Sequence, residues 1–211
     1  MDFEQRSPEW FAKRAGAFTA SRMADLMART KSGYPAASRK NMIATLAIER
    51  LTGECVPTYS NSAMERGIDL EQEAINAYSF ETGSAVQSAA YIDHKSLERV
   101  GCSPDGLVGA TGLVEVKCPA SMSKHLDALR SGQHATEYRW QLQHQLFVSE
   151  RLWVDAVSYD PRFPVGLQLA IKRIEPVDED QSAIAEEIEK ASAEIAEIVA
   201  ELRALNNAEA A

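Results

Sequence analysis

The sequence predicts an α/β fold in which a mixed central β-sheet is flanked by helices and the chain ends in an amphipathic helix. Three observations lead to this fold class. The first 82 residues space their apolar side chains as helices do, short β-rich segments bounded by turn residues follow, and two helical stretches separate the third of these segments from the fourth. Strands interrupted by helices form layered folds, because the helices cover the apolar faces of the sheet.

The N-terminal part of the chain is expected to be mostly helical. Ser7 and Pro8 make a good N-cap and first-turn pair, and Thr19 or Ser21 can cap a second piece. Gly, Pro and Ser residues within 30–38 predict a loop. The expected helices cover residues 7–29 in two pieces, 41–51 and 64–82, and the last two are stopped by Gly53 and Gly83.

Five strands and two helices are expected in the next part of the chain. The strands are rich in β-branched and aromatic residues and cover residues 86–93, 99–108, 113–117, 152–159 and 166–174. The two helices, at 123–131 and 136–149, lie between the third and fourth strands. We expect residues 1–177 to form the body of the domain.

Residues 178–211 are expected to be an acidic helical segment of the same domain. Between residues 181 and 205, Ile, Val and Leu recur at the spacing of one helix face, while the other faces are acidic. This stripe predicts a final helix docked on the sheet. Contact with another subunit or with a partner is the alternative interpretation of the same stripe.

Composition excludes several classes of protein. The 211 residues suit one domain, and three cysteines are too few for a disulfide-rich miniprotein or a four-cysteine iron–sulfur site. No apolar run approaches the roughly 20 residues of a membrane span, and the first residues carry no signal-peptide pattern. A cytoplasmic protein without a membrane partner is expected.

The distribution of charge is more informative than the total. The chain has 22 Lys and Arg residues against 31 Asp and Glu residues, a net charge of −9. Residues 178–211 hold ten acids and two bases, or −8, which leaves −1 for residues 1–177. Residues 1–50 hold nine bases and five acids, or +4, so a polyanionic partner is compatible with this sequence.

The residues that suggest chemistry lie in one predicted hairpin. Alternation along the strand at 113–117 places Glu115 and Lys117 side by side on one face. Gly109 to Gly112 supply a turn that can return the chain so that Asp105, in the stretch Ser-Pro-Asp-Gly, lies beside Glu115. Two carboxylates and one ammonium group then converge at one edge of the hairpin.

Two neighbouring carboxylates repel each other, so keeping both ionised requires a cation. Oxygen ligands from carboxylates, a main-chain carbonyl and water suit Mg²⁺, which can lower the pKa of a bound water and contact a phosphate oxygen. Lys117 can orient that water or offset charge on the phosphate. The alternative is a chance arrangement on a surface hairpin, in which Glu115 and Lys117 form a solvated pair.

These residues resemble the PD-(D/E)xK nuclease superfamily, and the longer match resembles its YqaJ-type viral recombinase branch, the phage lambda exonuclease family. Stretches outside the hairpin extend the resemblance in order over about residues 8–175: Trp10, Arg14 and Gly16, then Thr19-Ala20-Ser21, Gly67 with Glu71, Gln141 with Gln143, and Tyr159-Asp160-Pro161-Arg162. The resemblance implies a restriction-endonuclease-like core. No Walker loop is present, so hydrolysis without ATP is expected.

The resemblance further implies a processive 5′→3′ exonuclease that acts on double-stranded DNA ends, releases mononucleotides and leaves a 3′ single strand. The implied cofactor is Mg²⁺, two ions per site, with Mn²⁺ as a possible substitute. The implied assembly is a homotrimeric ring around DNA, with the basic N-terminal surfaces lining the channel and the acidic tails facing outward. A single-strand annealing protein of phage or prophage recombination in a bacterial host is the implied partner.

Site residues follow from the same resemblance. Asp105 and Glu115 would bind metal together with the Val116 carbonyl, Lys117 would position the attacking water, and Glu71 would join the second metal or its water shell. A pocket for the terminal 5′-phosphate would be formed by residues that all carry phosphate donors, namely Arg14, Ser21, Ser103 and Gln141.

Two further assignments have structural alternatives of equal weight. Met64 occupies the position of an apolar wedge that splits the terminal base pairs, or is a packing residue of a first helical turn. Lys31 occupies the position of an arginine that reaches the downstream duplex, or is a solvated loop lysine. The helix at 136–149 carries glutamine where helicase-linked nucleases carry tyrosine, so the acting residue can be Gln141, Gln143 or Gln145.

Two other functions remain open from the sequence. One is an endonuclease of the same superfamily, of the resolvase or restriction type. The other is a DNA-end binding protein without catalytic activity, against which the intact set of Asp105, Glu115 and Lys117 argues.

Overall fold

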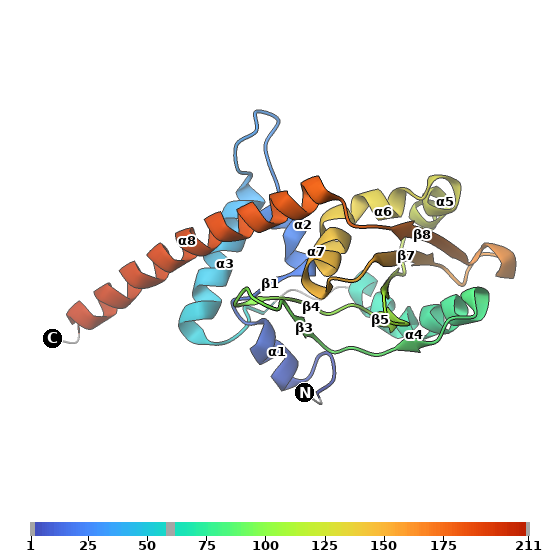
Figure 1. Ribbon diagram of the computed structural model, residues 1–211, viewed down its shortest axis with the longest axis horizontal. Helices are drawn as coiled ribbons and strands as arrows, with labels where there is room; N and C mark the ends of the chain where they lie inside the picture. The colour runs from blue at the N-terminus through green and yellow to red at the C-terminus, as the bar shows by residue number, and fades with distance from the viewer. Residues whose placement is uncertain (1–2, 58–61, 210–211) are drawn as a thin grey trace.

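The computed structural model describes residues 3–57 and 62–209 and has a mixed α/β architecture (Figure 1). Its central sheet has five strands in the order β2-β5-β6-β7-β8, namely Val86–Gln87, Gly106–Val108, Gly112–Lys117, Trp153–Tyr159 and Leu169–Ile174. The β6–β7 pair is parallel and the other pairs are antiparallel, so the predicted mixed central sheet is confirmed.

A second sheet of three strands, in the order β1-β4-β3, was not expected from the sequence. It contains Phe18–Thr19, Val100–Cys102 and Ile92–Asp93. The expectation of one strand over 86–93 and another over 99–108 was therefore wrong, since each of these segments contributes one short strand to each sheet. Pro104 has no N–H to continue a ladder, and the chain crosses from the small sheet to the large one at that residue.

The predicted long helices are present, with one break. They are α3 (Ala37–Thr52), α4 (Ser62–Thr82), α5 (Met122–Ser131) and α7 (Arg139–Ser149). The helix expected over 136–149 is interrupted at Tyr138, whose φ of −99° and ψ of 17° separate α7 from the short helix α6 (Gln133–Glu137). Gly53 ends α3 in the left-handed conformation, with a φ of 77°.

The N-terminal part is less helical than expected. Helix α1 (Pro8–Arg14) begins as predicted, with the Ser7 side chain accepting a hydrogen bond from the Trp10 backbone N–H. The second piece was predicted to be a longer helix, but Phe18 and Thr19 instead pair with β4. Only a 3₁₀ turn (Ala20–Arg22) and the short helix α2 (Met23–Leu26) follow, because the backbone of this segment is used by the small sheet.

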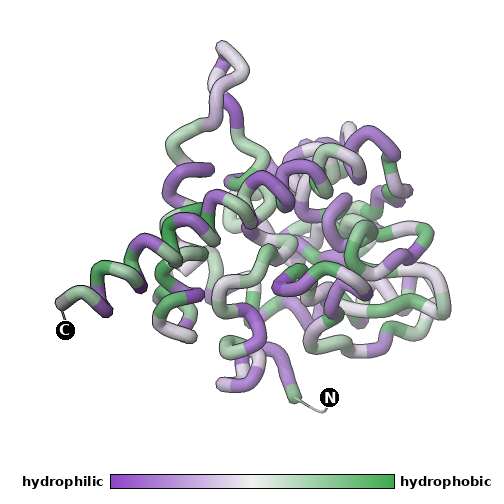
Figure 2. The backbone as a smooth tube through the Cα atoms, turned by 60° about the vertical axis from the view of Figure 1, so that its left-hand side comes forward, coloured by the Kyte–Doolittle hydropathy of each residue, from purple (hydrophilic) through white to green (hydrophobic). Residues whose placement is uncertain are grey.

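The C-terminal helix α8 (Asp178–Glu209) packs against α3 and α7, not on the sheet as predicted (Figure 1). Its buried face carries Ile184, Ile188 and Ile195, which belong to the same apolar cluster as residues of α2, α3 and the small sheet. Figure 2 shows hydrophobic and hydrophilic residues alternating along this helix. The docking face is therefore the predicted apolar stripe as far as Val199, with a different partner. Leu202 and Leu205, at the end of the predicted stripe, are exposed.

Two carboxylates of the acidic tail are buried within the chain itself, while the outward orientation of the tail in a ring stays a prediction. Asp180 and Glu187 are 3% and 4% exposed. Glu187 accepts hydrogen bonds from Arg29 and Arg39 of the basic N-terminal part, and Asp180 is bound by Arg139. Because α8 crosses the N-terminal helices, the acidic tail and the basic N-terminal part neutralise each other at Glu187. Asp180 is neutralised instead by Arg139 of α7.

None of the helices in the described ranges combines the length and apolar character that crossing a bilayer requires.

Candidate active site

The predicted hairpin places three of the predicted site residues together. Strands β5 and β6 pair in antiparallel register with Gly106 opposite Val114, so that Asp105, one residue before β5, lies opposite Glu115. An oxygen of the Asp105 carboxylate accepts a hydrogen bond from the Val116 backbone N–H at 2.7 Å. The Lys117 Nζ atom lies 2.5 Å from Glu115 Oε1. The two carboxylates and the ammonium group thus lie close together. Asp105 follows directly after the chain has passed from the small sheet to the large one.

The site carries more negative than positive charge. Burial and the neighbouring charge of Glu115 raise the pKa of Asp105 well above its usual range, although Lys117 and the hydrogen bond from Val116 oppose this. Burial alone would lower the pKa of Lys117, but the charges of Glu115 and Asp105 outweigh it and raise that pKa. A second cation would relieve the remaining repulsion, since one ammonium group serves two carboxylates.

The residues present suit a cation with oxygen ligands. Asp105 and Glu115 provide carboxylate oxygens, and Val116 lines the same cavity as Asp105. Glu71, on α4, lines that cavity as well, but its carboxylate is bound by Arg6 at 2.8 Å. Among the described residues, no three His, Cys, Asp or Glu side chains lie close enough together to bind a metal ion by themselves. The arrangement fits Mg²⁺, which keeps several waters and uses few protein carboxylates.

The three glutamines of α7 differ in the groups that they contact. Gln141 and Gln145 lie one helical turn apart and donate hydrogen bonds to opposite oxygens of Glu115, Oε1 and Oε2. Gln143 faces the other way, donating to the Glu175 carbonyl and accepting from the Val177 backbone N–H. Two residues along a helix rotate a side chain to the far side, so Gln143 anchors the start of α8 and does not reach the site.

The four residues predicted to bind a 5′-phosphate line one small cavity. It has a volume of about 150 Å³ and is bordered by Asp105 and Glu115 as well as by Arg14, Ser21, Ser103 and Gln141. An Arg14 guanidinium nitrogen donates to Ser21 Oγ at 3.2 Å. The residues come from α1, the 3₁₀ turn, the end of β4 and α7, and only the fold brings them together.

Arg14 is a cation without a carboxylate of its own. No ion pair among the described residues includes it, and its guanidinium carbon lies 4.1 Å from the centre of the Trp10 ring. Burial, with the charge of Arg22, lowers the pKa of Arg14. A partly buried guanidinium in this state is stabilised by an incoming anion.

A larger cavity of about 730 Å³ adjoins the small one, since Ser21 and Asp105 line both. Its walls include Glu71, Lys117 and Met64, so the predicted wedge residue and the predicted catalytic lysine line the same cavity. The Met64 side chain is 49% exposed. Lys31 lines neither cavity and lies in the exposed loop that projects from the body in Figure 1.

Three contributors to these cavities were missed in the sequence. Tyr138, at the break between α6 and α7, places its ring 4.9 Å from Lys117 Nζ. Gln5 donates to the Pro104 carbonyl and Arg6 binds Glu71, so the residues before α1 cover part of the site. No local pattern marks these positions. The break at Tyr138 in particular could not be predicted, because the apolar residues of 136–149 keep the spacing of one continuous helix.

The motif at the end of β7 supports the loop beside the site. Asp160 is fully buried and binds Arg162 at 2.6 Å and Arg66 of α4 at 3.3 Å. Arg162 also donates to the carbonyls of Pro119 and Ala120, in the loop that follows β6. The pKa of Asp160 is lowered, chiefly by its hydrogen bond with Arg162. This cluster joins three segments that line the larger cavity or border it.

Comparisons with known proteins agree with this geometry. A family model described as the YqaJ-like viral recombinase domain matches residues 9–151. The chain is similar to the crystal structure of an alkaline exonuclease, LHK-Exo, from Laribacter hongkongensis, with 41% identity and a TM-score of 0.86 over 97% of this chain and 100% of that chain. A structure of LHK-Exo in complex with dAMP matches at 42% identity, with the same TM-score and coverage.

A phage-related exonuclease from Haemophilus somnus 129PT shares the fold, with 16% identity and a TM-score of 0.73 over 88% of this chain and 96% of that chain. No curated protein sequence matches the chain.

Proposed function

Because the chain belongs to the YqaJ-like viral recombinase family, we propose that it is a Mg²⁺-dependent exonuclease that degrades double-stranded DNA from its 5′ ends. It would release mononucleotides processively and leave a 3′ single strand for an annealing protein. Support comes from the family, from the similarity to an alkaline exonuclease and from the geometry of the two cavities.

One observation carries the proposal. The small cavity with Arg14, Ser21, Ser103 and Gln141 shares its wall with Asp105 and Glu115. A guanidinium group, two hydroxyls and an amide are suited to a terminal phosphate, and the adjoining carboxylates are suited to the metal that cleaves the next bond. An end held by its 5′-phosphate would therefore present one fixed bond for hydrolysis.

The side chains divide the reaction between them. Asp105, Glu115, the Val116 carbonyl and Glu71 would hold Mg²⁺, two ions per site in this proposal, with Mn²⁺ as a substitute. When bound, Mg²⁺ supplies an acidified water and a contact to the scissile phosphate. Lys117 would orient the attacking water from its position on Glu115. Met64 would separate the terminal base pairs, and Lys31, from its projecting loop, would contact the duplex further along.

The direct test compares linear duplexes that carry 5′-phosphate or 5′-hydroxyl ends, with Mg²⁺ and with chelator. Mononucleotides should appear only with Mg²⁺ and faster from the phosphorylated end. Nicking of closed circles without degradation of linear DNA would instead identify an endonuclease, and binding of ends without any product would identify a non-catalytic end-binding protein.

The phosphate pocket has its own test. Arg14→Ala should remove the preference for 5′-phosphorylated ends while leaving Mg²⁺-dependent cleavage of 5′-hydroxyl ends measurable, because Arg14 would bind the phosphate and not the metal. The ratio of the two initial rates measures the preference. A ratio equal to that of the unmodified protein would contradict the assignment.

Family membership is also our basis for proposing a homotrimeric ring that encloses DNA and an annealing protein as partner. Sedimentation equilibrium would give the subunit number. Co-purification with the candidate annealing protein would test the partnership.

A further inference from the structure

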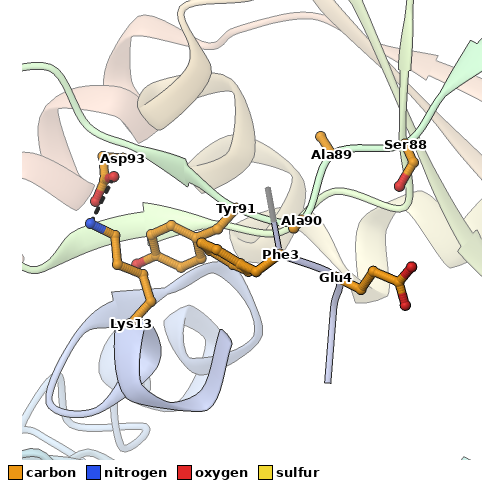
Figure 3. Close-up of a pocket in the computed structure, with 8 residues that line it drawn as sticks. All are labelled: Phe3, Glu4, Lys13, Ser88, Ala89, Ala90, Tyr91 and Asp93. Carbon is orange, nitrogen blue, oxygen red and sulfur yellow. Dashed lines mark ion pairs between the residues drawn. The ribbon is translucent and has the colours of Figure 1, made fainter. Parts of the chain in front are cut away.

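The segment before α1, residues 3–7, is fastened across the edge of the active site, and we call it the N-terminal strap. Gln5 Nε2 donates to two carbonyl oxygens, of Ala89 at 3.1 Å and of Pro104 at 3.0 Å. Figure 3 shows the Phe3 ring alongside the Tyr91 ring at the start of this strap. Ser7 ends it as the N-cap of α1. The residues on both sides of Arg6, Gln5 and Ser7, are therefore held in place by hydrogen bonds.

Arg6 itself has an unusual backbone. Its φ is 69°, in the left-handed region that residues with a Cβ rarely adopt. Such a conformation is strained and persists only where the neighbouring contacts enforce it. Here the consequence is that the Arg6 side chain lines the larger cavity, together with Asp105 and Lys117.

The contact that holds Arg6 at rest is weak. Its guanidinium lies 2.8 Å from Glu71, and the two side chains are 45% and 27% exposed. Ion pairs at that exposure contribute little to stability, because water screens them. Arg6 can therefore exchange Glu71 for another anion at little cost, whereas Lys117, which lines the same cavity, is held on the buried Glu115.

Resting on the proposed function, we propose that Arg6 is a DNA-phosphate-binding residue of the active-site cavity. In this proposal, Glu71 holds the Arg6 guanidinium in the cavity until a backbone phosphate of DNA replaces Glu71 as the partner of Arg6. A planar guanidinium fork suits phosphate, and cation binding at Glu71 would release Arg6 in the same step as it prepares the site.

The test measures binding of the full chain to 5′-phosphorylated linear duplex in chelator, by fluorescence anisotropy, for the unmodified protein, Arg6→Ala and Arg6→Lys. Lys13→Ala is the matched control. Lys13 also forms a partly exposed ion pair near the N-terminus, 2.9 Å from Asp93, but it lines the separate cavity drawn in Figure 3.

Arg6→Ala should weaken binding and reduce the salt slope by about one between roughly 50 and 200 mM salt, because one phosphate contact is lost. Arg6→Lys should keep the slope, since it keeps the charge, and Lys13→Ala should leave both affinity and slope unchanged. Thermal unfolding of each variant checks that it is folded.

Two results would overturn the inference. One is an Arg6→Ala protein with the affinity and salt slope of the unmodified protein, in which case Arg6 only balances Glu71. The other is an equal loss in Lys13→Ala, which would indicate a general effect of surface charge. Failure of the proposed function is recognised separately, because the unmodified protein would then not degrade linear duplex at all.

Discussion

Buried charges occur in two regions of this molecule, and they are balanced differently. At the interface of α3 and α8, Glu187 is 4% exposed and is met by two cations, Arg29 and Arg39. At the hairpin, Glu115 is 3% exposed and is met by one cation, Lys117, while Asp105 adds a second carboxylate. The first region is complete as it stands, and the second lacks positive charge.

The difference separates structural from functional charge. Burying an ion is costly unless its partners are in place, so a complete pair such as Arg39 with Glu187 mainly holds two helices together. An incomplete set stays costly until a ligand of opposite charge binds. The charge deficit at the hairpin therefore suits the metal ion that we propose there, and the Arg14 guanidinium, which no carboxylate pairs among the described residues, suits the proposed phosphate.

The largest expected effect is on chemistry. Lys117→Ala should reduce cleavage by at least about 10³-fold, because the lost contact acts mainly in the transition state, while DNA binding is retained. Single-turnover cleavage and anisotropy measure the two quantities. Lys95→Ala, which removes a lysine from an exposed ion pair with Glu150, is the control. Near-normal turnover of Lys117→Ala would contradict the proposal that the charges at the hairpin are functional.

The next effect is on stability. Arg39→Ala should lower the free energy of unfolding by about 3 kcal/mol, because Glu187 stays buried with one partner fewer. Lys190→Ala breaks an exposed pair with Glu186 on the same helix and should change it by less than about 0.5 kcal/mol. Urea unfolding at neutral pH compares them. Equal values for the two variants would show that the α3–α8 ion pairs are not structural.

A pair of glutamines two residues apart sharpens the comparison within a single helix. Gln145→Ala should lower activity by about 10- to 100-fold, since a group that orients a metal-binding carboxylate is lost. Gln143→Ala should leave activity near normal and lower stability instead, because Gln143 holds the start of α8. Steady-state rates at several Mg²⁺ concentrations, alongside urea unfolding, distinguish the two. The reverse pattern would contradict the assignment.

The smallest effect concerns pH. Hydrogen bonding to Arg39 lowers the pKa of Glu194, so Glu194 binds fewer protons when the protein is folded. Its contribution to stability is present above the usual glutamate pKa of about 4.3 and is lost as pH falls through the lowered value. Glu194→Gln should therefore flatten the loss of stability below about pH 4.3. If Glu194→Gln lost stability with falling pH as the unmodified protein does, the Arg39–Glu194 pair would not contribute to stability.

Local patterns predicted much of the site. Alternation in β6 and the glycine turn were enough to place Asp105, Glu115 and Lys117 together, because a short hairpin has few possible registers. The family resemblance, which the comparisons confirm, selected Arg14, Ser21, Ser103 and Gln141 for one pocket. The structure places all four there, although their function stays a prediction.

The sequence by itself determined the mixed α/β class, the long helices, the hairpin with Asp105, Glu115 and Lys117, and the apolar face of α8, because these depend on spacing along one segment. Only the tertiary structure decided that the segments at 86–93 and 99–108 divide between two sheets and that α8 docks on helices. It also decided that Gln145 and not Gln143 faces Glu115, and that Arg6 lies over the site. Each of these depends on contacts between segments far apart in the chain, which no local periodicity records.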